Sequence, residues 1–154
     1  MTVQTIAQYL PEHPFFAGLD PATLELAAGC AVNVHFRPGA VLFREGDPAD
    51  VFYVLRSGRV SIQMRTPTEG VLLDTAHAGD VVGWSWLVPP YRWTFDALAT
   101  EDTSAIAFDG ACLRGKCEND AALGYALLQR VVQVMSGRLH SARVRLLDLY
   151  GVKP

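Results

Sequence analysis

The sequence contains no hydrophobic run long enough to cross a membrane, since none approaches the ~18–20 apolar residues that a span requires. Its first residues lack the basic patch and the apolar stretch of a secretory signal peptide. Positive charge is not in excess either, because the net charge is −3 at pH 7. Nothing general therefore attracts the chain to nucleic acid or to an anionic membrane. We expect a cytoplasmic globular protein that binds neither of them directly.

Patterns for disulfides and metal sites are also missing. Cys30, Cys112 and Cys117 are an odd number of cysteines and match no disulfide framework. The spacing from Cys112 to Cys117 is too long for a metal-binding knuckle, and the four histidines are scattered. We expect reduced thiols that pack as small apolar side chains, and no metal site.

Motifs for catalysis are absent as well, since the sequence has no P-loop and no G-x-G-x-x-G. The run from Gly83 to Leu87 superficially resembles a G-x-S-x-G nucleophile elbow, but its last glycine is missing. Ser85 fits better as the N-cap of a short helix. We therefore expect no enzyme and no catalytic residue.

The middle of the chain, residues 31–108, alternates hydrophobic residues with polar or small ones, as half-buried strands do. About eight short strands are expected there, separated by turns such as Pro38-Gly39 and Ser57-Gly58. The last two are Trp93–Ala99 and Ser104–Phe108. Such density leaves no room for crossover helices, so the sheets are antiparallel. The pattern predicts a mainly β fold with flanking helices, in which a double-stranded β-helix (jelly-roll) forms a β-roll.

Helical patterns flank this roll on both sides. Residues 1–30 form an N-terminal helical segment, with Asp20 as an N-cap before a helix. In residues 109–154, Asp109 caps a short helix, and a long helix then runs to Leu149.

Two hydrophobic stripes follow the long helix. The stripe Leu123, Leu127, Val131 and Val134 occupies its first half and suits packing on the roll. The other stripe has the alternating spacing of four and three that is typical of a coiled coil. Its members are Leu128, Val132, Met135, Leu139, Ala142, Leu146 and Leu149. We expect this seam to form a parallel homodimer; the alternative is that both stripes are buried within one subunit.

The spacing of turn glycines within the strands carries a resemblance. The matching residues are Pro38-Gly39, Phe43 to Asp50, Phe52 to Leu55, Ser57-Gly58, Val60, Gly79-Asp80 and Gly83. With them the sequence resembles the cyclic nucleotide-binding domain family over residues 13–149. That family provides the sensor module of catabolite-activator and fumarate–nitrate regulators, kinase regulatory subunits and gated channels. The resemblance implies a β-roll followed by a short helix and a long dimerising helix.

The resemblance also implies a ligand-binding cassette at residues 83–97. In the family, a glycine opens a short helix whose N–H groups face the cyclic phosphate, a glutamate binds the ribose 2′-hydroxyl, and an arginine neutralises the phosphate. Here Gly83 matches, Trp84 replaces the glutamate, and Trp93 occupies the arginine position. Arg92 is displaced by one residue, which in a strand sends the side chain to the opposite face. The candidate ligand-binding residues are Gly83, Trp84, Ser85, Trp86, Arg92, Trp93 and Thr94.

Three interpretations of this tryptophan-rich cassette remain open. The pocket is remade for a different ligand, or filled by tryptophan without a ligand, or still binds a cyclic nucleotide in an atypical way. No cofactor is certain, and a cyclic nucleotide is the one that the resemblance implies. We expect a regulatory sensor domain that acts through a partner protein, because no helix-turn-helix follows Leu149. The alternative is a degenerate accessory subunit without a ligand, docked on a larger enzyme such as a redox enzyme.

Overall fold

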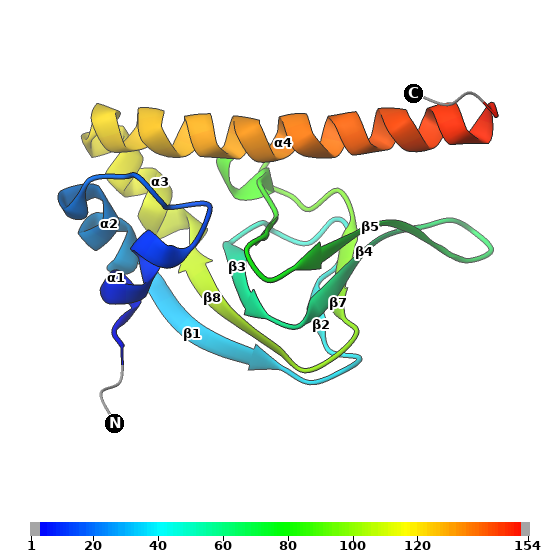
Figure 1. Ribbon diagram of the computed structural model, residues 1–154, viewed down its shortest axis with the longest axis horizontal. Helices are drawn as coiled ribbons and strands as arrows, with labels where there is room; N and C mark the ends of the chain where they lie inside the picture. The colour runs from blue at the N-terminus through cyan, green and yellow to red at the C-terminus, as the bar shows by residue number, and fades with distance from the viewer. Residues whose placement is uncertain (1–3, 152–154) are drawn as a thin grey trace.

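The β-roll consists of two four-stranded antiparallel sheets, with strand orders β1-β8-β3-β6 and β2-β7-β4-β5 (Figure 1). This arrangement comes from a computed structural model, which describes residues 4–151. The strands are β1 (Ala31–Phe36), β2 (Val41–Phe43), β3 (Val51–Ser57), β4 (Arg59–Arg65), β5 (Gly70–His77), β6 (Val81–Val82), β7 (Asp96–Ala99) and β8 (Thr103–Asp109). The predicted fold class, a jelly-roll flanked by helices, is confirmed.

One expected strand is shorter than the sequence pattern suggested. Alternation predicted a strand over Trp93–Ala99, but β7 begins only at Asp96. The residues before Asp96 instead form a loop that lies against the β2–β3 turn. In this loop Arg92 forms an isolated β-bridge with Pro48. Trp93 donates its backbone N–H to the Asp47 carbonyl at 3.0 Å in the same loop. The loop forms no regular strand because its hydrogen-bond partner is a turn rather than another strand.

The tight connection between β3 and β4 requires the glycine that the sequence places there. Gly58 has a φ of 93°, in the left-handed region that favours glycine. A Cβ atom on it would lie 2.4 Å from the Asp102 carbonyl oxygen and 2.4 Å from the Thr103 hydroxyl. The β3–β4 turn therefore packs directly on the β7–β8 turn and closes one end of the roll.

Stacked aromatic rings join the N-terminal segment to the roll. Phe52 of β3 stacks between Phe108 and Trp86, with ring centroids 4.8 Å and 4.6 Å away. Phe16 stacks in turn on Phe108, at 5.2 Å. All four rings are fully buried, so this stack anchors three distant parts of the chain in one core.

The helices include two that begin at the capping residues indicated by the sequence. The helical elements are α1 (Ile6–Tyr9), the 3-10 turn η1 (Leu10–Glu12), α2 (Pro21–Ala28), α3 (Gly110–Asn119) and α4 (Ala121–Leu149), with a second 3-10 turn, η2 (Ser85–Leu87), in the cassette. The carboxylates of Asp20 and Asp109 accept hydrogen bonds from the first turns of α2 and α3. Residues 1–3 and 152–154 of the expected flanking segments lie outside the described residues.

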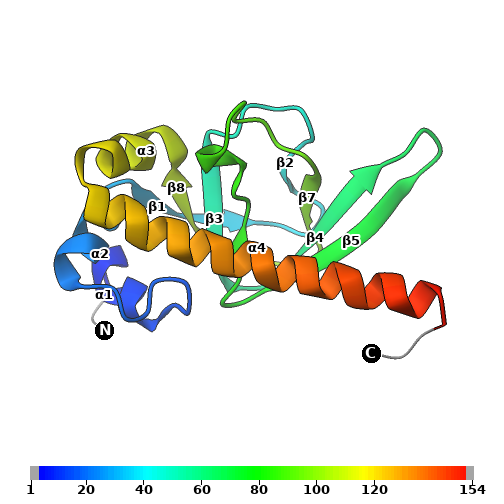
Figure 2. The same cartoon turned by 90° about the horizontal axis from the view of Figure 1, so that it is seen from above.

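The long helix α4 lies over one side of the roll, directly above η2 (Figure 1). Seen from above, α4 and the β4–β5 hairpin diverge towards their far ends (Figure 2). The stripe Leu123, Leu127 and Val131 is buried against the rest of the molecule. Packing of this stripe fixes the first half of α4, whereas its second half extends past the core.

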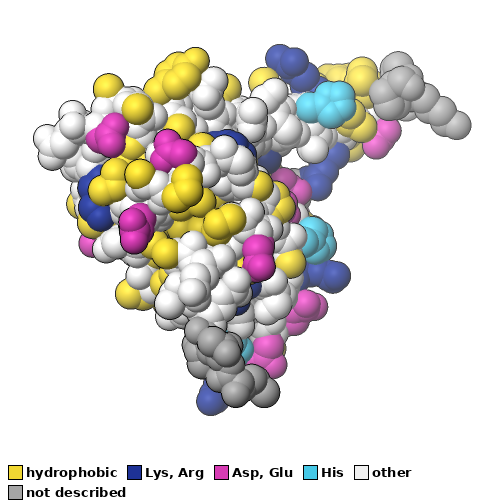
Figure 3. All heavy atoms as spheres, turned by 60° about the vertical axis from the view of Figure 1, so that its left-hand side comes forward, with side chains coloured by type: hydrophobic (Ala, Val, Ile, Leu, Met, Phe, Trp, Pro, Cys, Tyr) yellow, Lys and Arg dark blue, Asp and Glu magenta, His cyan; other side chains and the backbone are white. Residues whose placement is uncertain are grey.

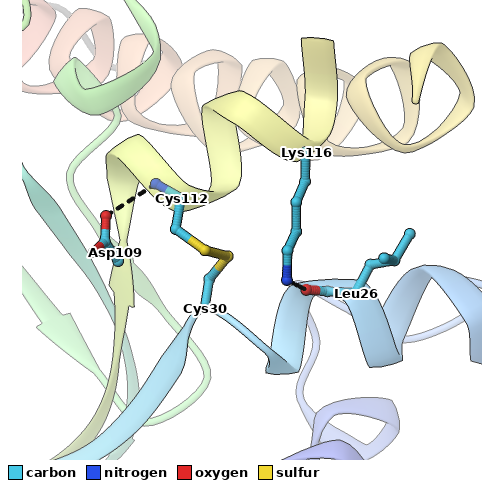
Figure 4. Close-up of a disulfide and its surroundings, with 5 residues drawn as sticks. All are labelled: Leu26, Cys30, Asp109, Cys112 and Lys116. Carbon is cyan, nitrogen blue, oxygen red and sulfur yellow. Dashed lines mark hydrogen bonds between the residues drawn. A yellow bond between two sulfur atoms is a disulfide. The ribbon is translucent and has the colours of Figure 1, made fainter. Parts of the chain in front are cut away.

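The expectation that all three cysteines are reduced is wrong. Cys30 and Cys112 form a disulfide, with their Cα atoms 5.8 Å apart (Figure 4). They are 82 residues apart in sequence, and they meet because α3 packs beside the junction of α2 and β1. Only Cys117 is a free cysteine within residues 4–151. Local cysteine spacing contains no information on such a long-range approach.

His13 is buried between the N-terminal segment and β3. Its Nδ1 accepts a hydrogen bond from the Phe15 N–H at 3.2 Å, and its Nε2 lies 3.2 Å from the Leu55 carbonyl oxygen. The neutral ring with its proton on Nε2 satisfies both contacts. Burial lowers the pKa of His13, and the Leu55 hydrogen bond and the charge of Asp80 oppose this effect only in part.

This lowered pKa predicts that acid destabilises the fold. Because the unfolded chain binds a proton at His13 more readily than the folded chain, stability is complete above the ordinary histidine pKa of about 6.5 and falls as the pH drops below it. Urea unfolding between about pH 7 and pH 5 should show a loss of up to about 1.4 kcal/mol per pH unit from this site. His13→Asn should remove that slope, while His140→Asn, at an exposed position on α4, should keep it. Equal slopes in the two variants would contradict the prediction.

Candidate functional site

The cassette contains one short helical turn rather than a regular helix. Gly83, with a φ of 98°, follows β6 and leads into η2. The residue that caps η2 is Trp84, and no side chain makes the capping hydrogen bond. The interpretation of Ser85 as an N-cap is therefore wrong: Ser85 lies one position later and is buried.

Trp93 covers the glycine that would face a ligand phosphate. A Cβ atom on Gly83 would lie 2.4 Å from both Cζ3 and Cη2 of the Trp93 indole. The indole is 2% exposed and stacks on Phe43, with ring centroids 3.7 Å apart and planes inclined by 9°. Its position is thus fixed by core packing. The surface of Gly83 is closed by an aromatic ring rather than open to an anion.

Arg92 lies outside this covered region. Its Nη1 donates a hydrogen bond to the Gly46 carbonyl at 2.9 Å, and the residue is exposed. Arg92 and Trp93 therefore point in different directions, as expected of neighbours in extended backbone. The one arginine of the cassette therefore closes the β2–β3 turn.

Trp86 is part of the core. It is fully buried on Phe52, and its indole N–H has no partner within the described residues. Its backbone carbonyl accepts a hydrogen bond from Arg114 of α3. The contact between Trp86 and Arg114 therefore connects η2 to α3.

A charged cluster under α4 was missed by the sequence analysis. Arg138 donates a hydrogen bond to the Val81 carbonyl at 2.6 Å and lies 3.7 Å from the Asp74 carboxylate. Arg145 lies 3.5 Å from the other oxygen of Asp74. Burial lowers the pKa of Arg138, while the charges of Asp74 and Asp80 raise it. The two arginines are seven residues apart and therefore lie on one face of α4. This spacing was the signal in the sequence that could have indicated the cluster.

Trp84 connects this cluster to the cassette. The guanidinium carbon of Arg138 lies 5.4 Å from the centroid of the Trp84 ring, within the range of a cation–π contact. Trp84 also packs edge-on against Phe95, at 6.0 Å. The residue at the expected glutamate position therefore contacts α4 instead of offering an acceptor for a hydroxyl group.

An open groove of about 440 Å³ lies beside Trp84, between the roll and the second half of α4. Most of its lining is apolar, and Arg138 and Arg145 with Asp74 form its polar edge. The remaining lining residues are Ile62, Leu72, Leu73, Trp84, Thr94, Phe95, Ser141, Ala142, Leu146 and Leu149. Of the seven candidate ligand-binding residues, Trp84 and Thr94 line the groove.

The predicted seam of α4 is exposed. Leu128, Val132 and Leu139 are 49%, 53% and 53% exposed, and the other seam residues are exposed as well. Hydrophobic side chains appear at several points along the upper edge of the molecule, where α4 runs, between polar and charged ones (Figure 3). At the far end of α4, Ala142, Leu146 and Leu149 line the groove and also belong to the seam. A partner at the seam and an occupant of the groove would therefore share a boundary.

Comparison with known proteins agrees with this fold. The cyclic nucleotide-binding domain profile matches residues 33–120. The CRP-like cAMP-activated global transcriptional regulator of Mycobacterium tuberculosis is 27% identical over 135 residues, which cover 87% of this chain and 58% of the regulator. The chain therefore spans little more than half the length of that relative.

Solved structures are similar over most of the chain. A Geobacter metallireducens protein named for cyclic nucleotide binding superposes with a TM-score of 0.80 and 29% identity, covering 90% of this chain and all of that one. The sensor domain of the transcriptional regulator DNR from Pseudomonas aeruginosa shares the fold, with a TM-score of 0.69 and 24% identity over 86% of this chain and 90% of that one. Among residues 4–151, no helix is both long and apolar enough to span a membrane.

The close contact of Trp93 with Gly83 predicts a large loss of stability for Gly83→Ala. Alanine is strained at a positive φ, which costs about 1–2 kcal/mol. Its methyl group would also clash with the indole, and this overpacking costs about 1–3 kcal/mol more. Gly39→Ala is the matched control, because Gly39 has a φ of 88° but no atom within 4 Å of its Cβ position. Chemical denaturation should show a clearly larger loss for Gly83→Ala. Equal losses would contradict the placement of Trp93.

Proposed function

The chain belongs to the cyclic nucleotide-binding domain family, and on that premise we propose that it is a non-catalytic regulatory sensor domain that uses a different ligand site. The proposed site is the groove beside Trp84. It replaces the backbone around Gly83, called the cradle below, where the family resemblance would place a phosphate. The observation that carries this proposal is the Trp93 indole packed on Gly83. It closes the position where the family resemblance would place a phosphate.

Loss of the family's polar contacts supports the proposal. A cyclic nucleotide in the family's position would need a hydroxyl acceptor at Trp84 and a cation near Gly83, and Arg92 is held at Gly46 instead. Each missing charge-assisted hydrogen bond is worth about 1.5–3 kcal/mol. Two of them weaken a micromolar site by about two to four decades. Cyclic nucleotides should therefore bind weakly or not at all.

The chemistry of the groove indicates the class of ligand. Its volume of about 440 Å³ lies within the usual range for small-molecule sites. Apolar side chains predominate, and the charges of Arg138 and Arg145 are already balanced in part by Asp74. A small, largely apolar or aromatic molecule suits this lining better than a highly charged phosphate.

The output of the domain would pass through α4. An occupant of the groove contacts the second half of α4 at Ser141, Ala142 and Leu146, next to the exposed seam. We propose that the seam forms a parallel homodimer and that ligand binding alters its geometry, which a partner protein detects in the cytoplasm. Regulation of a partner requires no catalytic residue and no direct contact with nucleic acid.

The same closed cradle favours one second candidate, the accessory subunit without a small-molecule ligand. Trp86 and Trp93 are both buried, as they would be in a filled core. Such a subunit would dock on a larger enzyme through its surface, and its groove would have no ligand of its own. The two candidates differ in whether the groove binds small molecules.

Calorimetric titration should separate these candidates. Cyclic AMP, cyclic GMP and cyclic dinucleotides should give no saturable heat up to about 1 mM. The aromatic probe 8-anilinonaphthalene-1-sulfonate should bind, and Leu72→Glu in the groove should weaken that binding about tenfold or more, because it places a charge in an apolar site. Val32→Glu is the matched control, since Val32 is 61% exposed and Leu72 58%, and Val32 is away from the groove.

Two outcomes would contradict the groove as a ligand site. Micromolar binding of a cyclic nucleotide that Arg92→Ala abolishes would restore the family's mode of binding. Probe binding that is equal in both glutamate variants, or absent altogether, would favour the accessory subunit instead.

The exposed seam predicts that the protein is a dimer at concentrations on the order of tens of micromolar, held together by one pair of helices. Leu139→Glu, at the centre of the seam, should yield monomers because it places two carboxylates face to face. Leu147→Glu is the control, since Leu147 is partly exposed on α4 but outside the seam. Light scattering should give a dimer mass for the wild type and the control and a monomer mass for Leu139→Glu. A monomeric wild type would contradict the prediction.

A further inference from the structure

The disulfide connects the short helix α3 to the start of the roll, and we propose that it is a reversible redox site. In the oxidised form it ties α3 to the junction of α2 and β1. Its reduction by a dithiol would remove this tie and loosen the contact of α3 with η2 and the beginning of α4. This inference goes beyond the proposed function and does not depend on what the groove binds.

Cys30 and Cys112 lie at two junctions of the fold. Cys30 lies between Gly29, which ends α2, and Ala31, the first residue of β1. Cys112 lies in the first turn of α3 (Figure 4), where its backbone N–H donates to the Asp109 carboxylate at 3.0 Å. The bond therefore joins a helix start to a strand start and restricts how far α3 can move from the sheet.

Other contacts keep α3 in place when the disulfide is absent. Lys116 donates a hydrogen bond to the Leu26 carbonyl at 2.8 Å (Figure 4), and the Asp109 N–H donates to the Cys30 carbonyl at 2.8 Å. Leu113 of α3 is fully buried. The reduced chain therefore retains a folded state, so that two forms of one structure exist rather than a folded and an unfolded one.

The two bonded cysteines border an open hollow. A hollow of about 420 Å³ is lined by both cysteines and by Gly29, Val51 and Asp109. Cys112 is partly exposed, whereas Cys30 is 7% exposed. A small thiol can therefore approach Cys112 first. Thiol–disulfide exchange requires such access for its attacking thiolate.

The exchange balances with a dithiol as the reductant. Its thiolate attacks Sγ of Cys112, a mixed disulfide forms, the bond between the two cysteines breaks, and Cys30 departs as a thiolate that takes up a proton. The second thiol of the reductant then attacks its own sulfur in the mixed disulfide and releases Cys112, which is protonated in turn. The protein gains two electrons and two protons, and the dithiol becomes a disulfide.

The third cysteine does not interfere with this exchange. Burial raises the pKa of the Cys117 thiol, and the nearby charges of Asp120 and Glu118 raise it further. Cys117 is therefore a poor nucleophile at neutral pH. It offers no competing partner for Cys30 or Cys112, and the pair opens and closes on its own.

Helix α3 links the disulfide to the cassette and to the long helix. A Cβ atom on Gly110 would lie 3.0 Å from the Cβ atom of Trp86, and Arg114 donates to the Trp86 carbonyl. The guanidinium of Arg114 also lies 4.2 Å from the Tyr91 ring centroid. Asp120 then ends α3 and caps α4. A shift of α3 would therefore reach η2 and α4 through direct contacts.

The test compares the oxidised and reduced full chain under native conditions. After native treatment with oxidised glutathione and removal of the reagent, alkylation of the unfolded chain with N-ethylmaleimide should add one group, at Cys117, and after dithiothreitol it should add three, one for each cysteine of the chain. Hydrogen exchange of residues 84–88 and 110–119 should become about tenfold faster in the reduced form. Exchange in the β4–β5 hairpin should not change.

Variants identify the source of this response. Cys117→Ser should keep the full redox response, and the double variant Cys30→Ser, Cys112→Ser should exchange as the reduced wild type does under both conditions. Three adducts after oxidised glutathione, or one after dithiothreitol, would overturn the proposal. Equal exchange in the two wild-type forms would also overturn it, because the bond would then be structural only. The wild-type comparison decides the question even if the double variant does not fold.

Discussion

The packing of Trp93 between Phe43 and Gly83 is the contact on which the rest of this site depends. It combines ring stacking at a centroid distance of 3.7 Å with burial of nearly the whole indole. Because the indole lies on Gly83 and φ there is 98°, any side chain at this position would meet both the ring and an unfavourable backbone conformation. An aromatic pair of this kind is worth about 0.5–1.5 kcal/mol beyond its burial. The cassette is therefore shaped by core packing before any ligand is considered.

The proposal of a ligand site in the groove rests on that contact. On the side that faces α4, Trp84 contacts Arg138, and Arg138 and Arg145 both lie near Asp74 of β5. They hold the second half of the long helix at a distance from the roll that leaves the groove between them. In this domain the long helix therefore forms one wall of the candidate site, with Arg138 in contact with Trp84.

The sequence was sufficient to predict the fold, because its evidence is local. Alternating hydrophobic residues, turn glycines and the caps Asp20 and Asp109 each act within a few residues, and the strands and helices appear where these signals place them. The missed features are all long-range. The disulfide joins residues 82 apart, and Asp74 meets α4 only after the roll has closed. Ser85 and the start of β7 were misplaced because the loop after Gly83 pairs with a turn, which no periodicity reveals.

The position of Trp84 has an optical consequence. Trp86 and Trp93 are buried in stacked pairs with phenylalanine, so their emission should be blue-shifted and insensitive to events at the surface. Trp84 is the one tryptophan that is partly exposed, and it lies between the Arg138 guanidinium and the groove. Any molecule that enters the groove, and any movement of α4, changes the surroundings of this single indole. The domain thus contains an intrinsic fluorophore that reports on its own conformation without a label.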